Sequence, residues 1–127
     1  MKPAAFDYLR AESADEVVAA LAQAGEDTCV LAGGQSLMTM LNMRLAQPAQ
    51  LIDISRLADL DYVKIAGDRL VIGAAVTQAS VEWRAGLSQE VPLLKLAFPH
   101  ISHFQIRNRG TVCGSIAHAD PTAELAL

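Results

Sequence analysis

The first part of the chain has apolar residues at two different spacings, one typical of a helix and one typical of strands. Through residues 14–24 the apolar side chains recur at intervals of three and four. Ser13 and Glu16 have the spacing of a capping box at the start of this segment, and Gly25 follows it as a suitable C-terminal residue. The pattern therefore predicts a helix over 14–24.

Short apolar runs on both sides of this helix predict a small sheet. Three runs have the length and composition of strands, at residues 6–9, 28–31 and 51–54, and the run at 28–31 is interpreted as buried. A shorter helix is predicted over 37–45. The order strand, helix, strand, helix, strand favours a parallel βαβ-type unit.

The second part of the chain has a different pattern. Two β-prone runs joined by Ala66–Arg69 predict an antiparallel hairpin. Thr77 is placed to cap a helix over 78–84, and a further helix is predicted over 93–98. A last strand is predicted over 110–116, leading to a glycine-containing loop.

The fold class that follows is α+β, with one unit over residues 1–54 and a second, mixed or antiparallel unit over 55–127. The 127 residues are 52% hydrophobic and 19% charged, which is typical of a globular chain. A net charge of −4 without a basic stripe argues against nucleic acid as a partner. We find no membrane-spanning run and no signal peptide, so a cytoplasmic location is expected.

Two glycine-containing segments are the strongest candidates for a binding site, namely Ala32–Ser36 and Thr111–Ser115. Successive backbone N–H groups in such turns can converge on an anion, and a helix that starts near Leu37 adds further N–H groups. A pyrophosphate held by both segments is therefore implied, with two plain turns as the alternative. The sequence contains none of the motifs of P-loop, Rossmann, zinc-protease or serine-hydrolase sites.

Three stretches of the sequence resemble the FAD-binding (medium) subunit of molybdenum hydroxylases, the xanthine dehydrogenase and carbon monoxide dehydrogenase family. AGGQSL at 32–37 matches the first FAD loop of that family, and LAQPAQLIDISRL at 45–57 matches the stretch leading out of its first subdomain. IRNRGTVCGSIAHADPTAEL at 106–125 matches the second FAD loop and its continuation. The resemblance implies a PCMH-type FAD-binding fold, with FAD-binding subdomains at 1–54 and 55–127, the second incomplete.

The resemblance also implies FAD as the cofactor and assigns its contacts. The first set is Ala32, Gly33, Gly34, Gln35, Ser36 and Leu37; the second is Thr111, Cys113, Gly114 and Ser115, with Glu124 as a further contact and Asp120 as a weaker candidate. Cys113 stands where the family commonly has glycine, so we expect an ordinary φ there and the unusual backbone at Gly114. No catalytic residue and no metal ligand is assigned, and the three histidines are interpreted as packed or solvent-facing.

The function implied by the resemblance is electron transfer in an oxidoreductase. Electrons would pass from iron–sulfur clusters through FAD to an acceptor, in a hetero-oligomer with a molybdopterin-binding large subunit and a [2Fe-2S] small subunit. This chain alone would not be active. Two alternatives are a truncated, non-catalytic association module and another flavoenzyme of the related fold. Because the family's subunit is longer, we also expect an incomplete chain that associates with itself near Ile116–Leu127.

Overall fold

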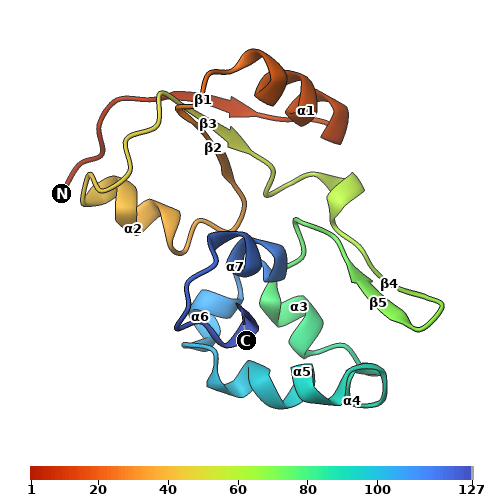
Figure 1. The fold of residues 1–127 in the computed structure, drawn as a ribbon. Helices are drawn as coiled ribbons and strands as arrows, with labels where there is room; N and C mark the ends of the chain where they lie inside the picture. Colours follow the sequence, from red (N-terminus) through yellow and green to blue (C-terminus); the bar gives the residue numbers. More distant parts are fainter. Residues whose placement is uncertain (127) are drawn as a thin grey trace.

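The computed structural model describes residues 1–126, and its N-terminal part is a three-stranded parallel sheet (Figure 1). The strands β1 (Asp7–Arg10) and β2 (Thr28–Leu31) both pair in parallel with β3 (Gln50–Asp53). The helix α1 (Ala14–Gln23) joins β1 to β2, and α2 (Leu37–Asn42) lies between β2 and β3 in the chain. The predicted parallel βαβ-type unit is confirmed.

Burial in this sheet is concentrated on β3, because β3 pairs with both neighbours and takes the middle position. Leu51 and Ile52 are 1% and 0% exposed, whereas Val30 of β2 is 40% exposed. The prediction of a buried strand at Thr28–Leu31 is therefore wrong in its burial, although the strand itself is present. The strand β2 is an edge strand.

The capping box at the start of α1 forms with a small shift. The hydroxyl of Ser13 accepts a hydrogen bond from the backbone N–H of Glu16 at 3.1 Å. The Glu16 carboxylate accepts in return from the N–H of Glu12 at 2.6 Å, one residue before the cap. Both ends of the predicted exchange are thus satisfied, and α1 begins where the sequence indicates.

The second part of the chain contains the predicted hairpin and a series of short helices. The strands β4 (Val63–Ala66) and β5 (Arg69–Ile72) pair antiparallel, and Gly67 has φ +64° in the turn. The remaining elements are η1 (Ala58–Leu60), α3 (Gln78–Glu82), α4 (Leu87–Glu90), α5 (Pro92–Ala97), η2 (Phe98–His100), α6 (Phe104–Arg107), α7 (Val112–His118) and η3 (Glu124–Ala126). None of the helices within residues 1–126 is long and apolar enough to cross a membrane.

The segment predicted as a last strand, 110–116, is mostly helix. Thr111 forms one isolated antiparallel bridge with Thr77, and α7 begins at the next residue. The hydroxyl of Thr111 caps α7 by accepting a hydrogen bond from the N–H of Gly114 at 3.0 Å. Thr111 and Val112 have an intrinsic preference for strands. The helix is stabilised instead by the cap of Thr111 and by the burial of Val112 in the core.

This correction changes the backbone expected around Cys113. Gly114 lies inside α7 and is not among the glycines with positive φ, so the unusual backbone predicted there is wrong. The glycine of the candidate segments that does have a left-handed conformation is Gly34, with φ +71°. Cys113 has an ordinary φ, as expected.

Two clusters of buried side chains form the core, one in each part of the chain. The first consists of Ala11, Val17, Ile52, Ile54 and Leu57. The second consists of Val76, Val81, Leu87, Phe98, Ile101 and Val112. Leu57 belongs to the first cluster and Ala74 packs against it, so buried contacts cross residue 54. The division into units 1–54 and 55–127 stays a prediction.

Candidate cofactor-binding cleft

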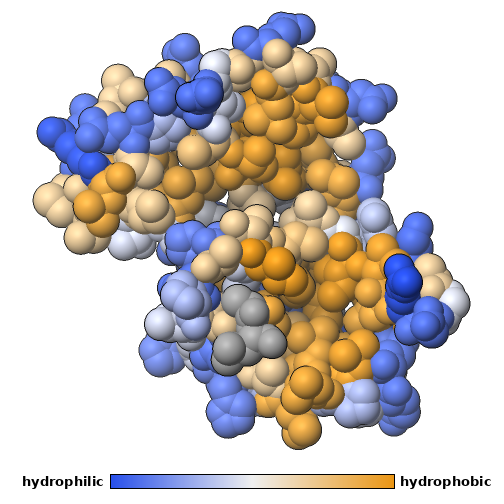
Figure 2. All heavy atoms as spheres, in the orientation of Figure 1, coloured by the Kyte–Doolittle hydropathy of each residue, from blue (hydrophilic) through white to orange (hydrophobic). Residues whose placement is uncertain are grey.

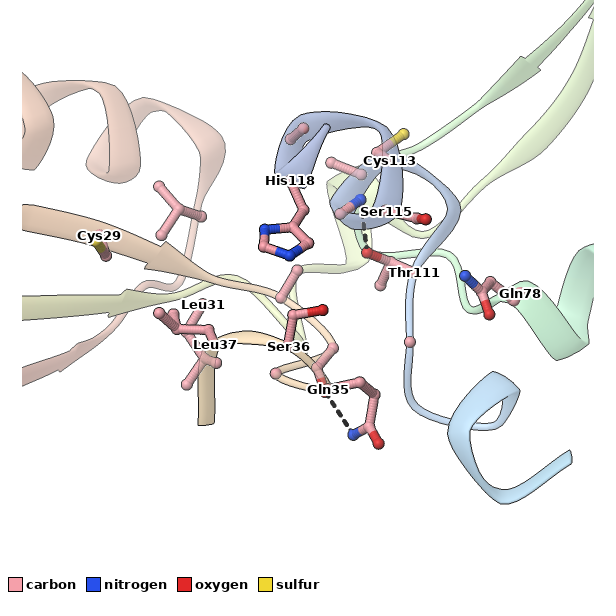
Figure 3. A pocket seen from close by; sticks show the side chains of 18 of the residues that line it. Cys29, Leu31, Gln35, Ser36, Leu37, Gln78, Thr111, Cys113, Ser115 and His118 are labelled. Carbon is pink, nitrogen blue, oxygen red and sulfur yellow. Dashed lines mark hydrogen bonds between the residues drawn. The ribbon is translucent and has the colours of Figure 1, made fainter. Parts of the chain in front are cut away.

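A cleft of about 740 Å³ separates the parallel sheet unit from α7 (Figure 3). One wall comes from β2, the segment Ala32–Ser36 and the start of α2. The other wall comes from α7, Gly110 and the start of α3. Sites for small molecules and cofactors have volumes of roughly 300–1,000 Å³, so the cleft is large enough for a nucleotide cofactor.

The two candidate segments, Ala32–Ser36 and Thr111–Ser115, lie together on opposite walls of this cleft. A Cβ atom added to Gly33 would overlap the backbone carbonyl oxygen of Arg109 and lie 2.7 Å from the Cα of Gly110. A Cβ on Gly114 would lie 4.0 Å from the Cβ of Ala32. The backbones approach this closely because glycine occupies the contact positions.

The first segment turns sharply from β2 into α2. Gly34 takes a positive φ, and its carbonyl oxygen accepts from the N–H of Met38 at 3.0 Å. The side-chain amide of Gln35 donates to the carbonyl oxygen of Gly33 at 3.0 Å, which steadies the turn. The hydroxyl of Ser36 makes no cap bond to α2. Because the N–H of Met38 is used within this turn, the hydroxyl of Ser36 and the other N–H groups at the start of α2 are the candidate donors for an anion.

The second segment is the first turn of α7 rather than a loop. Thr111 is 4% exposed and its hydroxyl is occupied as the helix cap, while Ser115 is half-buried and faces the same cleft. The Cys113 thiol lies 3.6 Å and 3.7 Å from the carbonyl oxygens of Ile72 and Gly73. Burial raises the pKa of the Cys113 thiol, so the thiol is protonated at neutral pH and is a poor nucleophile.

All of the predicted contact residues except Asp120 line the cleft: Ala32, Gly33, Gly34, Gln35, Ser36, Leu37, Thr111, Cys113, Gly114, Ser115 and Glu124. Asp120 instead closes a turn, because its carboxylate accepts from the N–H and the hydroxyl of Thr122, both at 2.8 Å. These hydrogen bonds lower the pKa of Asp120. The structure thus brings the main set together and leaves Asp120 out of the lining.

The cleft also contains residues that the sequence analysis missed. His118, in the last turn of α7, faces the cleft near Ser36 in Figure 3, and Gln78 begins α3. The others are Thr28, Cys29, Val30, Leu31, Met40, Ala46, Ile54, Ala74, Ile101, Ile106, Gly110, Ala117 and Ala123. For these residues the local sequence gave one indication, the cap at Thr77, which places the start of α3 at Gln78.

The geometry defines a class of protein: an α+β domain with a cleft of the size of a nucleotide cofactor between a small parallel sheet and a capped helix. Among residues 1–126, no three His, Cys, Asp or Glu side chains lie together as a metal site. The cleft is instead lined by hydroxyl-bearing side chains, including those of Ser36, Thr111 and Ser115, and by many apolar side chains.

The chain belongs to the family of FAD binding domains in molybdopterin dehydrogenases, whose family model matches residues 4–127. It is 43% identical over 127 residues to the 6-hydroxypseudooxynicotine dehydrogenase complex subunit alpha of Paenarthrobacter nicotinovorans, covering 100% of this chain and 43% of that protein. It is 40% identical over 125 residues to the caffeine dehydrogenase subunit beta of a Pseudomonas species, covering 98% of this chain and 42% of that one.

Solved structures show the same fold. The carbon monoxide dehydrogenase of Hydrogenophaga pseudoflava superimposes with a TM-score of 0.93 at 41% identity, over 98% of this chain and 44% of that one. The quinoline 2-oxidoreductase of Pseudomonas putida 86 superimposes with a TM-score of 0.92 at 38% identity, again over 98% and 44%. The chain therefore spans less than half the length of these relatives, and the predicted α+β FAD-binding fold is confirmed.

FAD is the cofactor of this family, and the cleft fits it. The position of Gly33 has no room for a side chain, because the backbone of Arg109 and Gly110 packs directly against it at the edge of the cleft. Gln78 contributes a buried amide oxygen that has no partner within the described part of the chain. The volume of the cleft, about 740 Å³, and its lining of hydroxyls and apolar side chains suit a ligand that carries phosphates, hydroxyls and flat rings.

Proposed function

We propose that this domain holds FAD along the cleft, with the pyrophosphate between Ala32–Ser36 and the first turn of α7. The observation that carries the proposal is the close contact between the first segment and the residues just before the second, where Gly33 packs against the backbone of Arg109 and Gly110. The hydroxyls of Ser36 and Ser115, one from each segment, line the same cleft, whereas the N–H groups of Val112, Gly114 and Ser115 already donate to Val76 and Thr111. Donors that converge in this way suit an anionic pyrophosphate.

The apolar parts of the same cleft suit the ring systems of the cofactor. Cys29, Val30 and Met40 line it on the sheet side, and Ile101 and Ile106 line it on the other. Apolar and aromatic surfaces bury flat rings and exclude water, while a few polar groups fix the orientation. The residues of the chain thereby bind the cofactor at its centre and shield it at its ends.

Bound FAD supplies redox chemistry, since a flavin can accept electrons singly and release them in pairs. The residues of this chain position the cofactor, and Cys113, the nucleophile-type side chain in the second segment, is kept protonated by burial. We infer that the domain is the electron-transfer part of an oxidoreductase. In this proposal electrons arrive from a [2Fe-2S] small subunit, which is itself reduced by a molybdopterin-binding large subunit.

The pyrophosphate position is tested by placing negative charge in it. Ser36→Asp and Ser115→Asp should each weaken FAD binding at least about tenfold, because a carboxylate would face the diphosphate. The matched control is Ser88→Asp, an exposed serine outside the cleft, which should leave the affinity unchanged. FAD affinity is measured by quenching of flavin fluorescence. Unchanged affinity in both cleft variants, with folding intact by circular dichroism, would contradict the proposed position.

The assembly is tested by purifying the protein with its natural partners and analysing bound flavin and metals. We expect a yellow complex that releases FAD and contains molybdenum and iron. A colourless protein that cannot be loaded with FAD would overturn the proposal and would support a non-catalytic association module. A yellow protein without molybdenum or iron would support another flavoenzyme of the related fold.

A further inference from the structure

His118 is an exposed residue whose side chain points into the cofactor cleft. It lies in the last turn of α7 and is one of the residues that line the cleft. The residue is exposed in the cofactor-free structure, so a ligand that enters the cleft can reach it. Figure 3 shows the imidazole ring between α7 and Ser36, which belongs to the opposite wall. A molecule that fills the space between the two walls would contact this ring.

His118 shares one face of α7 with a residue of the proposed pyrophosphate position. Ser115 precedes it by three residues, and residues at this spacing are neighbours on the surface of a helix. Both residues line the cleft. On the opposite wall, the hydroxyl of Ser36 does not cap α2. The imidazole and the two serine hydroxyls therefore form one group of hydrogen-bond donors around the same space.

The lining of the cleft contains little positive charge. Among its residues within 1–126, His118 is the only one with a basic side chain, and Glu124 is the only one with an acidic side chain. The wall formed by residues 28–42 has no charged side chain. Each phosphate of FAD has a single acid group, which is ionised at neutral pH. A diphosphate in this cleft therefore has His118 as its source of a positive side chain.

The other titratable groups near the imidazole, or in the same lining, are two carboxyl groups and two thiols. The pKa of Asp120 is lowered by hydrogen bonds in its own turn and, to a smaller extent, by the charge of His118. Glu124 belongs to η3, which packs against α7. The thiols are those of Cys29 and Cys113, and burial raises the pKa of the Cys113 thiol. Between pH 6 and pH 8, imidazole is the side-chain type in this set that normally changes its charge.

We propose that the protonated imidazole of His118 donates a hydrogen bond to the diphosphate of FAD, so that the domain binds its cofactor more tightly as the pH falls. This inference rests on the proposed function of the cleft and adds a residue to it. A hydrogen bond between two ionised groups is stronger than one between neutral groups. The serine hydroxyls keep their charge state over this pH range, whereas the imidazole does not. Binding of FAD is thereby coupled to the uptake of a proton by His118.

The test is the pH dependence of FAD affinity, measured by quenching of flavin fluorescence. The affinity of the wild-type protein should fall about fivefold between pH 6 and pH 8.5, because the imidazole loses its positive charge. His118→Gln keeps a hydrogen-bond donor without the charge, so its affinity should be low and nearly independent of pH. His118→Lys supplies a positive charge over the whole range, so its affinity should stay high. Added KCl should reduce the effect in the wild-type protein, since salt screens exposed charges.

His103→Gln is the matched control, because His103 is an exposed histidine outside the cleft. This variant should keep the pH dependence of the wild-type protein. Substitution of an exposed histidine should leave the thermal midpoint of the cofactor-free protein unchanged in all three variants. The midpoint is measured at both pH values, so that a loss of affinity is separated from a loss of folding.

Fragments of the cofactor show whether the diphosphate is the group that His118 binds. ADP-ribose contains the same diphosphate without the flavin, whereas riboflavin contains the flavin without a phosphate. At pH 6, His118→Gln should weaken the binding of ADP-ribose and leave the binding of riboflavin unchanged, as measured by isothermal titration calorimetry. Weaker binding of riboflavin, with unchanged binding of ADP-ribose, would place the imidazole at the flavin and overturn the proposal.

The pH profile of FAD binding can also overturn it. An affinity that is the same at pH 6 and pH 8.5 would show that the charge of the imidazole does not act on the cofactor. An affinity that changes equally in the wild-type protein and in His118→Gln would assign the effect to another group. In both cases FAD binding by the wild-type protein keeps the proposed function intact. Failure of the wild-type protein to bind FAD at either pH removes the proposed function and this inference together.

Discussion

At the scale of single residues, Gly33 is the position where the backbone contact at the cleft is most demanding. A Cβ atom there would overlap the carbonyl oxygen of Arg109 and crowd the Cα of Gly110 at 2.7 Å, and backbone atoms cannot move aside as a flexible side chain can. We expect Gly33→Ala to lower the free energy of unfolding by about 1–3 kcal/mol, as overpacking does, and to weaken FAD binding. Urea denaturation and flavin fluorescence measure the two effects.

The control for this variant is another glycine in an open position. A Cβ on Gly25 meets nothing within 4 Å, and its φ is not positive. Gly25→Ala should therefore be neutral or slightly stabilising, since alanine restricts the unfolded chain more than glycine does. Equal stability of Gly33→Ala and Gly25→Ala would show that the backbone of Arg109 and Gly110 can shift to make room. The close contact at Gly33 would then not require glycine.

Cys113 gives a prediction about reactivity. Burial raises the pKa of its thiol, so less thiolate is present at a given pH than for an exposed cysteine. We expect iodoacetamide to modify Cys113 slowly at pH 7–8 in the folded protein, with a rate that rises at higher pH than it does for the same peptide in urea. Mass spectrometry of digested samples reports the rate. Fast modification at neutral pH would favour a reactive thiol and would contradict the effect of burial.

The candidate site was predictable from the sequence only where the residues are close together in the chain. Glycines and hydroxyl side chains at Ala32–Ser36 and Thr111–Ser115 indicated donors for an anion, and the resemblance joined the two segments. Gln78 and His118 enter the cleft through the pairing of α3 with α7, which no local pattern encodes. Asp120 carries the right charge for a contact but is used by a turn with Thr122.

At the scale of elements, the ion pair between Glu82 and Arg107 joins α3 to α6. Arg107 donates from Nε to Oε2 of Glu82 at 2.8 Å and from Nη2 to Oε1 at 3.2 Å, and the side chains of Arg107 and Glu82 are 11% and 9% exposed. Its Nη1 also donates to the carbonyl oxygen of Ile101 at 2.8 Å. Removing one partner leaves an uncompensated buried charge, so Arg107→Met should lower the free energy of unfolding by about 3–5 kcal/mol.

Two further variants make this prediction sharp. Arg69 pairs with Asp68 on the surface, where the side chains are 84% and 95% exposed, so Arg69→Met should have no measurable effect on the urea midpoint. The double variant Glu82→Leu, Arg107→Met should recover part of the loss, because no buried charge is left without a partner. A double variant as unstable as Arg107→Met alone would show that the loss comes from packing and not from the charge.

The elements themselves were largely predictable, and the exceptions have physical reasons. The helix at Ala14–Gln23 and the hairpin at 63–72 have strong local signals, a capping box and a turn glycine, and both are confirmed. The prediction that β2 is buried is wrong, because β3 pairs with both other strands and leaves β2 at the edge of the sheet. The prediction of a strand at 110–116 is wrong, because the cap formed by Thr111 and the packing of α7 outweigh the β preference of Thr111 and Val112.

At the scale of the whole molecule, the cleft lies between two parts that have separate buried clusters. A ligand that binds both walls stabilises the folded state by mass action. FAD at a concentration 100 times its dissociation constant should add about 2.7 kcal/mol to the free energy of unfolding and raise the thermal midpoint by several degrees. Ser36→Asp should reduce this gain and Ser88→Asp should not. A midpoint that is independent of FAD concentration would contradict a site between the two parts.

Association of the chain with itself is the last prediction, and it depends on apolar side chains at the surface (Figure 2). The sequence placed this surface near Ile116–Leu127; Ile116 is 53% exposed, and residue 127 lies outside the described residues. The larger exposure is on α5, where Leu93 and Leu96 are 77% and 69% exposed and lie one helical turn apart. Two large apolar side chains exposed next to each other on one helix are suited to an interface.

We therefore expect the purified chain to sediment as a concentration-dependent mixture of monomer and larger species at micromolar concentration. Leu93→Lys combined with Leu96→Lys should shift it towards monomer, because a charged side chain cannot be buried in an apolar contact without a large desolvation cost. Leu45→Lys changes a leucine of similar exposure, 70%, that lies just after α2 in the other part of the chain, and it should leave the distribution unchanged. A wild-type protein that sediments as a monomer at every concentration would contradict the prediction. Equal effects of the α5 variants and of Leu45→Lys would mean that α5 is not the contact surface. The added positive charge would then reduce association wherever it is placed.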